Sequence, residues 1–111
     1  MKIPQDADGD AMRRVLEHGS DPTSPMDIDF MIACPDVASA DKIAPLAAAS
    51  GYSVRITVDE EDDSVTCYCT MKMLLDYDPL ISCQSQLDSI GRQHGAYIDG
   101  WGTFGNFADG K

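Results

Sequence analysis

The chain has 111 residues and a formal net charge of −11, from 19 acidic and 8 basic residues. This length indicates a single domain over residues 1–111, and an apolar content of 43% argues against disorder. The excess of acidic residues disfavours direct binding of nucleic acid, because phosphates would be repelled. Neither a membrane-length apolar run nor a charged-then-apolar leader occurs, so we expect a cytoplasmic protein.

The first predicted element is a helix over about residues 6–19. Its apolar residues Met12, Val15 and Leu16 share one helical face. An aspartate, Asp8 or Asp10, is expected to cap its start, since a carboxylate accepts hydrogen bonds from free N–H groups there. A loop containing two prolines follows the helix.

The same segment also has the spacing of a calcium-binding loop. Asp6, Asp8, Asp10 and Glu17 occupy positions 1, 3, 5 and 12 of an EF-hand. The turn glycine is misplaced, however, because Ala11 stands at position 6, and too few residues precede Asp6 for an entering helix. Helix capping is therefore the preferred interpretation, and no metal site is predicted.

Residues 27–34 alternate between apolar and polar side chains, which predicts a half-buried strand. The alanine-rich segment 35–51 predicts a helix with Asp36 as its cap. Pro45 removes one helical hydrogen bond, so either the helix kinks there or its regular part begins near Asp41.

Two further alternating segments, residues 52–58 and 64–74, flank the acidic run 59–63 and predict a hairpin with a solvated turn. Cys67 and Cys69 fall on one face of the second strand, where we interpret them as small buried hydrophobes.

The next segment, residues 78–95, predicts a helix with Asp78 as cap and Pro79 in its first position. A short strand over residues 96–101 comes last.

The predicted order α-β-α-β-β-α-β indicates an α+β fold: a ferredoxin-like split β-α-β sandwich with an extra N-terminal helix. Right-handed crossovers give a four-stranded antiparallel sheet of order 4-1-3-2, with both main helices on one face. The core would span about residues 27–101, and residues 105–111 would form a short tail.

Strict alternation assigns one set of side chains to the face opposite the helices. This set is acidic and aromatic, and we take it as the candidate partner-binding site: Asp27, Asp29, Tyr68, Tyr97, Asp99 and Trp101. Aromatic sheet faces also bind single-stranded RNA, but the aspartates stand where phosphates would pass. For Trp101 a second interpretation stays open, in which it anchors the N-terminal helix.

We recognise in the sequence no nucleophile paired with a base, no phosphate-binding loop and no cofactor motif. Neither enzymatic activity nor a cofactor is therefore expected. Three stretches nevertheless resemble the regulator of ribonuclease E activity B (RraB) family: Gly9 to Pro22, Ser50 to Val54, and Tyr97 to Phe104, the last containing the distinctive DGWGT. Better-known members continue into an acidic tail, whereas GNFADGK follows Phe104 here.

The resemblance implies a bacterial cytoplasmic protein that binds ribonuclease E, or a related basic protein segment, and inhibits RNA decay without catalysis. An acidic surface suits such a partner, because opposite charges speed encounter and favour the correct patch. The alternative is a generic ferredoxin-like module that binds a ligand or protein unconnected with RNA decay.

Overall fold

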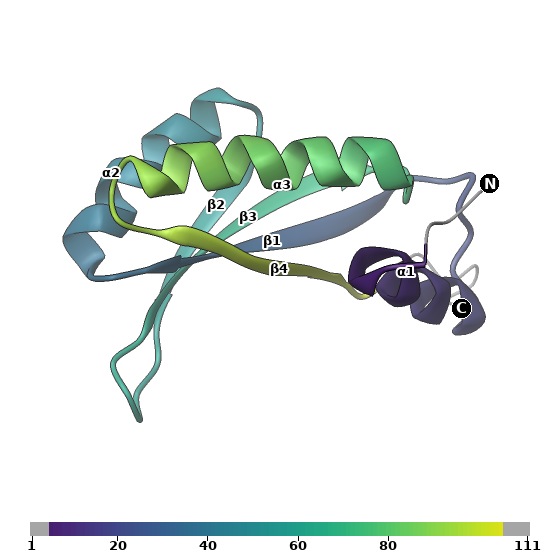
Figure 1. Ribbon diagram of the computed structural model, residues 1–111, viewed down its shortest axis with the longest axis horizontal. Coiled ribbons are helices and arrows are strands. Elements are labelled where there is room, and N and C mark those ends of the chain that lie inside the picture. The colour runs from purple at the N-terminus through teal and green to yellow at the C-terminus, as the bar shows by residue number, and fades with distance from the viewer. Residues whose placement is uncertain (1–4, 106–111) are drawn as a thin grey trace.

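A computed structural model describes residues 5–105 and contains three helices and four strands (Figure 1). In chain order these are α1 (Ala7–Glu17), β1 (Met26–Cys34), α2 (Val37–Ala49), β2 (Ser53–Val58), β3 (Val65–Met73), α3 (Tyr77–Arg92) and β4 (Tyr97–Thr103). The expected tail over residues 105–111 lies, apart from its first residue, outside the described residues. No helix within the described range has both the length and the apolar character needed to cross a bilayer.

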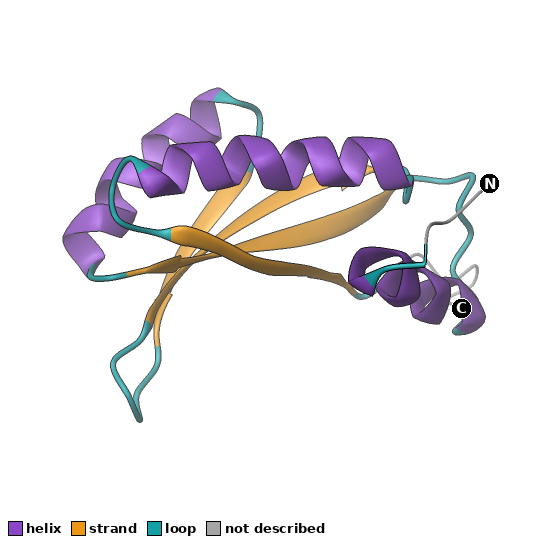
Figure 2. Ribbon diagram, in the orientation of Figure 1, coloured by secondary structure: helices purple, strands orange, loops and turns teal. Residues whose placement is uncertain are grey.

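The strands form one antiparallel sheet of order β2-β3-β1-β4, which confirms the predicted order. Helices α2 and α3 lie together on one face of this sheet, and α1 lies beyond its end, close to the last residues of β4 (Figures 1 and 2). The opposite face carries no helix in the described part of the chain.

The core lies between the sheet and the two helices that cover it. Alternate residues of β1 are inaccessible to solvent, and so are the apolar residues that α2 and α3 turn toward the sheet. The largest fully buried side chains are Phe30, Met12, Met26, Ile28, Ile32, Ile43, Leu75, Leu80, Leu87, Cys67 and Cys69. Burying each large apolar side chain stabilises the fold by about 1.5–3 kcal/mol. The interpretation of Cys67 and Cys69 as free, buried hydrophobes is confirmed.

The start of α2 confirms Asp36 as its cap, whereas the start of α3 corrects the expectation that Asp78 is the cap. Helix α2 begins at Val37, directly after Asp36, whose side chain accepts a hydrogen bond from the Ser39 N–H at 2.8 Å. The regular helix therefore begins before Asp41, and Pro45 lies inside it. Helix α3 begins at Tyr77 rather than after Asp78, so Asp78 belongs to its first turn, where a carboxylate favours the helix dipole.

Candidate functional site

The uncovered face of the sheet is the first candidate surface. It carries alternate side chains of all four strands, identified from the pairing register: Asp27, Asp29, Met31, Ala33, Ser53, Arg55, Thr57, Thr66, Tyr68, Thr70, Lys72 and Tyr97. Asp99, at the irregular part of β4, joins this set because it lines one pocket with Ala33, Thr66 and Tyr97. Five of the six predicted site residues are in this set. Tyr97 is 51% exposed, and Asp27 and Asp99 are exposed too.

Contacts within this face divide it into two halves. Lys72 of β3 lies 3.9 Å from a carboxylate oxygen of Asp27, and the Thr70 hydroxyl donates a hydrogen bond to Asp29. The Arg55 guanidinium lies 4.6 Å from the centroid of the Tyr68 ring, a cation–π geometry. Arg55 thus covers one side of the Tyr68 ring. The β1–β4 half of the face carries mainly carboxylates, whereas its cations, Arg55 and Lys72, lie on β2 and β3.

Trp101 does not lie on this face, contrary to the prediction. Ile98 pairs with Ile32, but the register then shifts, and Trp101 pairs with Phe30 on the helix-covered side. The cause is a β-bulge, in which two residues of β4, Asp99 and Gly100, oppose a single residue of β1. Gly100 has φ of +122°, a backbone conformation that glycine adopts without steric cost. Alternation beyond the bulge is therefore inverted.

The indole of Trp101 instead attaches α1 to the rest of the fold. Its Nε1–H donates to the Asp8 carboxylate at 2.9 Å, and the Gln84 side-chain amide of α3 donates to the same oxygen at 3.2 Å. The ring is half-buried and packs against the hydrophobic core. Of the two interpretations left open by the sequence, the contacts favour the anchor for α1. Gln84 carried no sequence signal for this role, because its partner Asp8 lies 76 residues away along the chain.

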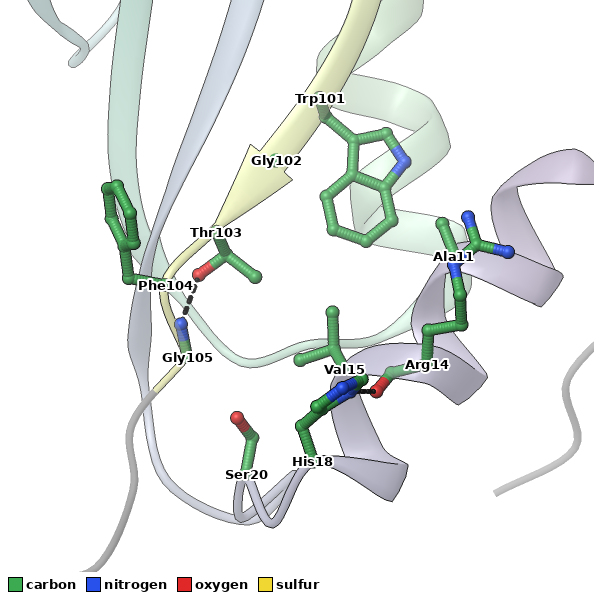
Figure 3. Close-up of a pocket in the computed structure, with 10 residues that line it drawn as sticks. All are labelled: Ala11, Arg14, Val15, His18, Ser20, Trp101, Gly102, Thr103, Phe104 and Gly105. Atoms are coloured by element: carbon green, nitrogen blue, oxygen red, sulfur yellow. Dashed lines mark hydrogen bonds between the residues drawn. The ribbon is translucent and has the colours of Figure 1, made fainter. Parts of the chain in front are cut away.

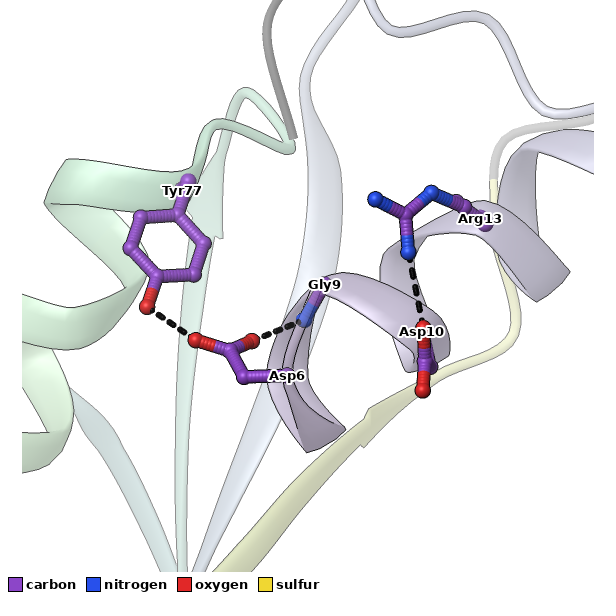
Figure 4. Close-up of polar contacts among 5 residues, drawn as sticks. All are labelled: Asp6, Gly9, Asp10, Arg13 and Tyr77. Carbon is purple, nitrogen blue, oxygen red and sulfur yellow. Dashed lines mark hydrogen bonds and ion pairs between the residues drawn. The ribbon is translucent and has the colours of Figure 1, made fainter. Parts of the chain in front are cut away.

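The two other aspartates near the start of α1, Asp6 and Asp10, have separate partners (Figure 4). Asp6, not Asp8 or Asp10, caps α1: it accepts a hydrogen bond from the Gly9 N–H at 2.8 Å and another from the Tyr77 hydroxyl at 2.6 Å. The Tyr77 hydrogen bond, followed by that of Gly9, lowers the pKa of Asp6 below its usual value. Asp10 pairs with Arg13 at 2.7 Å. Among residues 5–105, no three candidate ligand side chains gather in a metal-binding arrangement.

Comparison with known proteins identifies the family. The family model described as "Regulator of ribonuclease activity B" matches residues 5–103. Proteins named regulator of ribonuclease activity B are similar over most of the chain. That of Actinobacillus succinogenes is 33% identical over 97 residues, covering 84% of this chain and 68% of the relative. That of Pseudoalteromonas atlantica is 30% identical over 102 residues, covering 86% and 85%. The Escherichia coli protein is 27% identical over 97 residues, covering 84% and 70%.

The chain belongs to the regulator of ribonuclease activity B family. The expectation drawn from three short stretches of sequence is thereby confirmed. Two of those stretches meet in space, because the first contains most of α1 and the last contains β4. Trp101 of the DGWGT motif reaches Asp8, the residue just before the first stretch. In this family member, the motif therefore has a structural task in holding α1.

Proposed function

We propose that the protein regulates a ribonuclease by binding a basic segment of it on the open sheet face, without taking part in RNA cleavage. The observation that carries this proposal is a sheet face that no described helix covers, with carboxylates along its β1–β4 half, in a chain of net charge −11. Relatives over most of the chain are named as regulators of ribonuclease activity. A regulator of this kind requires a surface, not a reactive group.

The proposed contact residues are Asp27, Asp29, Tyr97 and Asp99. Their carboxylates face solvent wholly or in part, and the exposed Tyr97 ring adds apolar area that can lie against the stem of a lysine or arginine. Tyr68 contributes less, since Arg55 lies over one side of its ring. Strand β4 is also an edge of the sheet, along which an extended segment can pair, although the Ile98 N–H there already donates to the Asp88 carboxylate at 2.9 Å.

The proposed partner is ribonuclease E or a related enzyme with a basic region outside its catalytic domain. Attraction between a chain of charge −11 and such a region raises the association rate and weakens as salt screens the charges. Inhibition then follows from occupancy of the region that organises RNA decay. Formation of the complex is therefore expected to depend on ionic strength.

The test measures affinity for the purified non-catalytic region of ribonuclease E by calorimetry at two salt concentrations. The variant carrying Asp27→Asn and Asp99→Asn removes two charges from the open face. Its matched control, Glu60→Gln with Glu61→Gln, removes two charges from the exposed β2–β3 turn. We expect about tenfold weaker binding for the first variant and less than about threefold for the control. Equal losses would show that only net charge matters, and absence of binding by the unaltered chain would refute the proposal.

A further inference from the structure

A pocket of about 450 Å³ lies between α1 and the end of β4 (Figure 3). Its size is within the range of small-molecule sites. Ala11 and Val15 line it from α1, and the six-membered ring of Trp101 extends toward it from β4. The indole nitrogen points away from it and is bonded to Asp8, so Trp101 offers the pocket an apolar surface. Most of the pocket wall is therefore suited to a ring.

One polar group that lines the pocket, the Ser20 hydroxyl, has no hydrogen-bond partner in the part of the chain that the structure describes. The Ser20 side chain is 7% exposed, and its hydroxyl is buried without a hydrogen bond to any described residue. Figure 3 shows this hydroxyl directed into the space between Val15 and Thr103. The Thr103 hydroxyl is already engaged, donating to the Asp27 carbonyl and accepting from the Gly105 N–H. A buried hydroxyl left unpaired is unfavourable, and a ligand that hydrogen-bonds to it would remove that penalty.

A cation lies at the opposite edge of the pocket. The Arg14 side chain runs along α1 past Ala11 (Figure 3), and its guanidinium forms no ion pair with any described residue. The neighbouring Arg13, in contrast, is paired with Asp10. His18 turns its Nδ1–H to the Arg14 carbonyl oxygen at 2.6 Å, which leaves the guanidinium unaffected. An arginine with no ion pair to any described residue is notable in a chain with 19 acidic residues.

We propose that this pocket binds a small aromatic carboxylate that carries a hydrogen-bonding group at the far end of its ring. The ring would lie against Trp101 and Val15, the carboxylate would pair with Arg14, and the distal group would bond to the Ser20 hydroxyl. We expect a negatively charged ligand, because the Arg14 cation lines the pocket and no described carboxylate does. This inference does not depend on the proposed ribonuclease partner.

The test uses three probes of one shape: para-hydroxyphenylpropanoate, its amide, and phenylpropanoate without the hydroxyl. Binding is followed by NMR through the indole N–H signal, which is unique because Trp101 is the only tryptophan. We expect the carboxylate to bind about fivefold more tightly than the amide, and the hydroxylated acid more tightly than phenylpropanoate.

Matched variants assign each preference to its residue. Arg14→Gln should abolish the preference for the carboxylate over the amide, whereas Arg13→Gln, one residue away but outside the pocket, should preserve it. Ser20→Ala should abolish only the preference for the hydroxyl, and should leave the thermal midpoint of the free protein unchanged or higher. The proposal is overturned if the three probes bind alike, if none shifts the indole signal, or if Arg13→Gln and Arg14→Gln have equal effects.

Discussion

Removing the Asp8 carboxylate should weaken the attachment of α1. In the Asp8→Ala variant, the Trp101 indole N–H and the Gln84 amide lose the oxygen to which both donate, at 2.9 and 3.2 Å. A hydrogen bond to a charged acceptor contributes about 1.5–3 kcal/mol, and partial exposure of this site reduces that figure. For the two bonds together we expect a loss of about 2 kcal/mol in the free energy of unfolding. In a chain of this length, that corresponds to a fall of roughly 8 °C in Tm.

Asp10→Ala is the matched control, because it makes the same chemical change in the same helical segment. Asp10 is exposed, and within residues 5–105 its side chain pairs only with Arg13, so its loss should cost no more than about 0.5 kcal/mol. Urea unfolding at neutral pH, followed by both circular dichroism and Trp101 emission, measures the two variants. The emission maximum of native Asp8→Ala should also move toward that of an exposed indole. If Asp8→Ala is no less stable than Asp10→Ala, the two hydrogen bonds do not hold α1 and the reasoning fails.

Three further predictions concern backbone, pH and thiol reactivity. Gly100→Ala should destabilise the protein by about 1–2 kcal/mol because φ is +122° there, whereas Gly102→Ala, with equally open surroundings, should change stability by less than about 0.5 kcal/mol; equal urea midpoints would contradict this. Because the folded state lowers the pKa of Asp6 from 3.8, the resulting stability is present above that value and is lost as the pH falls through the folded pKa. Tyr77→Phe should therefore reduce the dependence of stability on pH below about pH 4, measured by urea midpoints, and an unchanged dependence would argue against the Tyr77 bond. Cys69, at 0% exposure, should be alkylated at least about 100-fold more slowly in the folded protein than in urea, and rapid native labelling detected by mass spectrometry would show that the core opens.

The sheet could be predicted from the sequence because its residues obey simple alternation. Ile28, Phe30 and Ile32 alternate with polar or less buried neighbours along β1, and the element order with right-handed crossovers fixes the strand order. Alternation failed after Asp99, where one additional residue in β4 inverted the faces. Gly100 was the available signal, since an isolated glycine in a strand often marks a bulge.

The roles of the α1 aspartates could be predicted only in part. Their spacing indicated a helix start, which is a local property, but Asp6 and Asp8 also bind groups on α3 and β4. No local pattern predicts such partners, because they depend on where α1 lies relative to the sheet. The pocket beside Ser20 is hidden from the sequence for the same reason: its two walls are about 80 residues apart in the chain.

The bulge at Gly100 also determines which side of the sheet each side chain of β4 faces. Before it, Tyr97 and Asp99 face outward on the open sheet; after it, Trp101 faces the side on which α1 is held. One edge strand thus supplies two separate surfaces, and a single residue decides which surface receives the indole. If β4 paired with β1 without the bulge, Trp101 would lie opposite Asp29 on the open face, and Asp8 would lose its β4 partner; deleting Gly100, by contrast, would remove the bulge and keep Trp101 opposite Phe30. In this fold, attachment of the N-terminal helix depends on a bulge in the last strand.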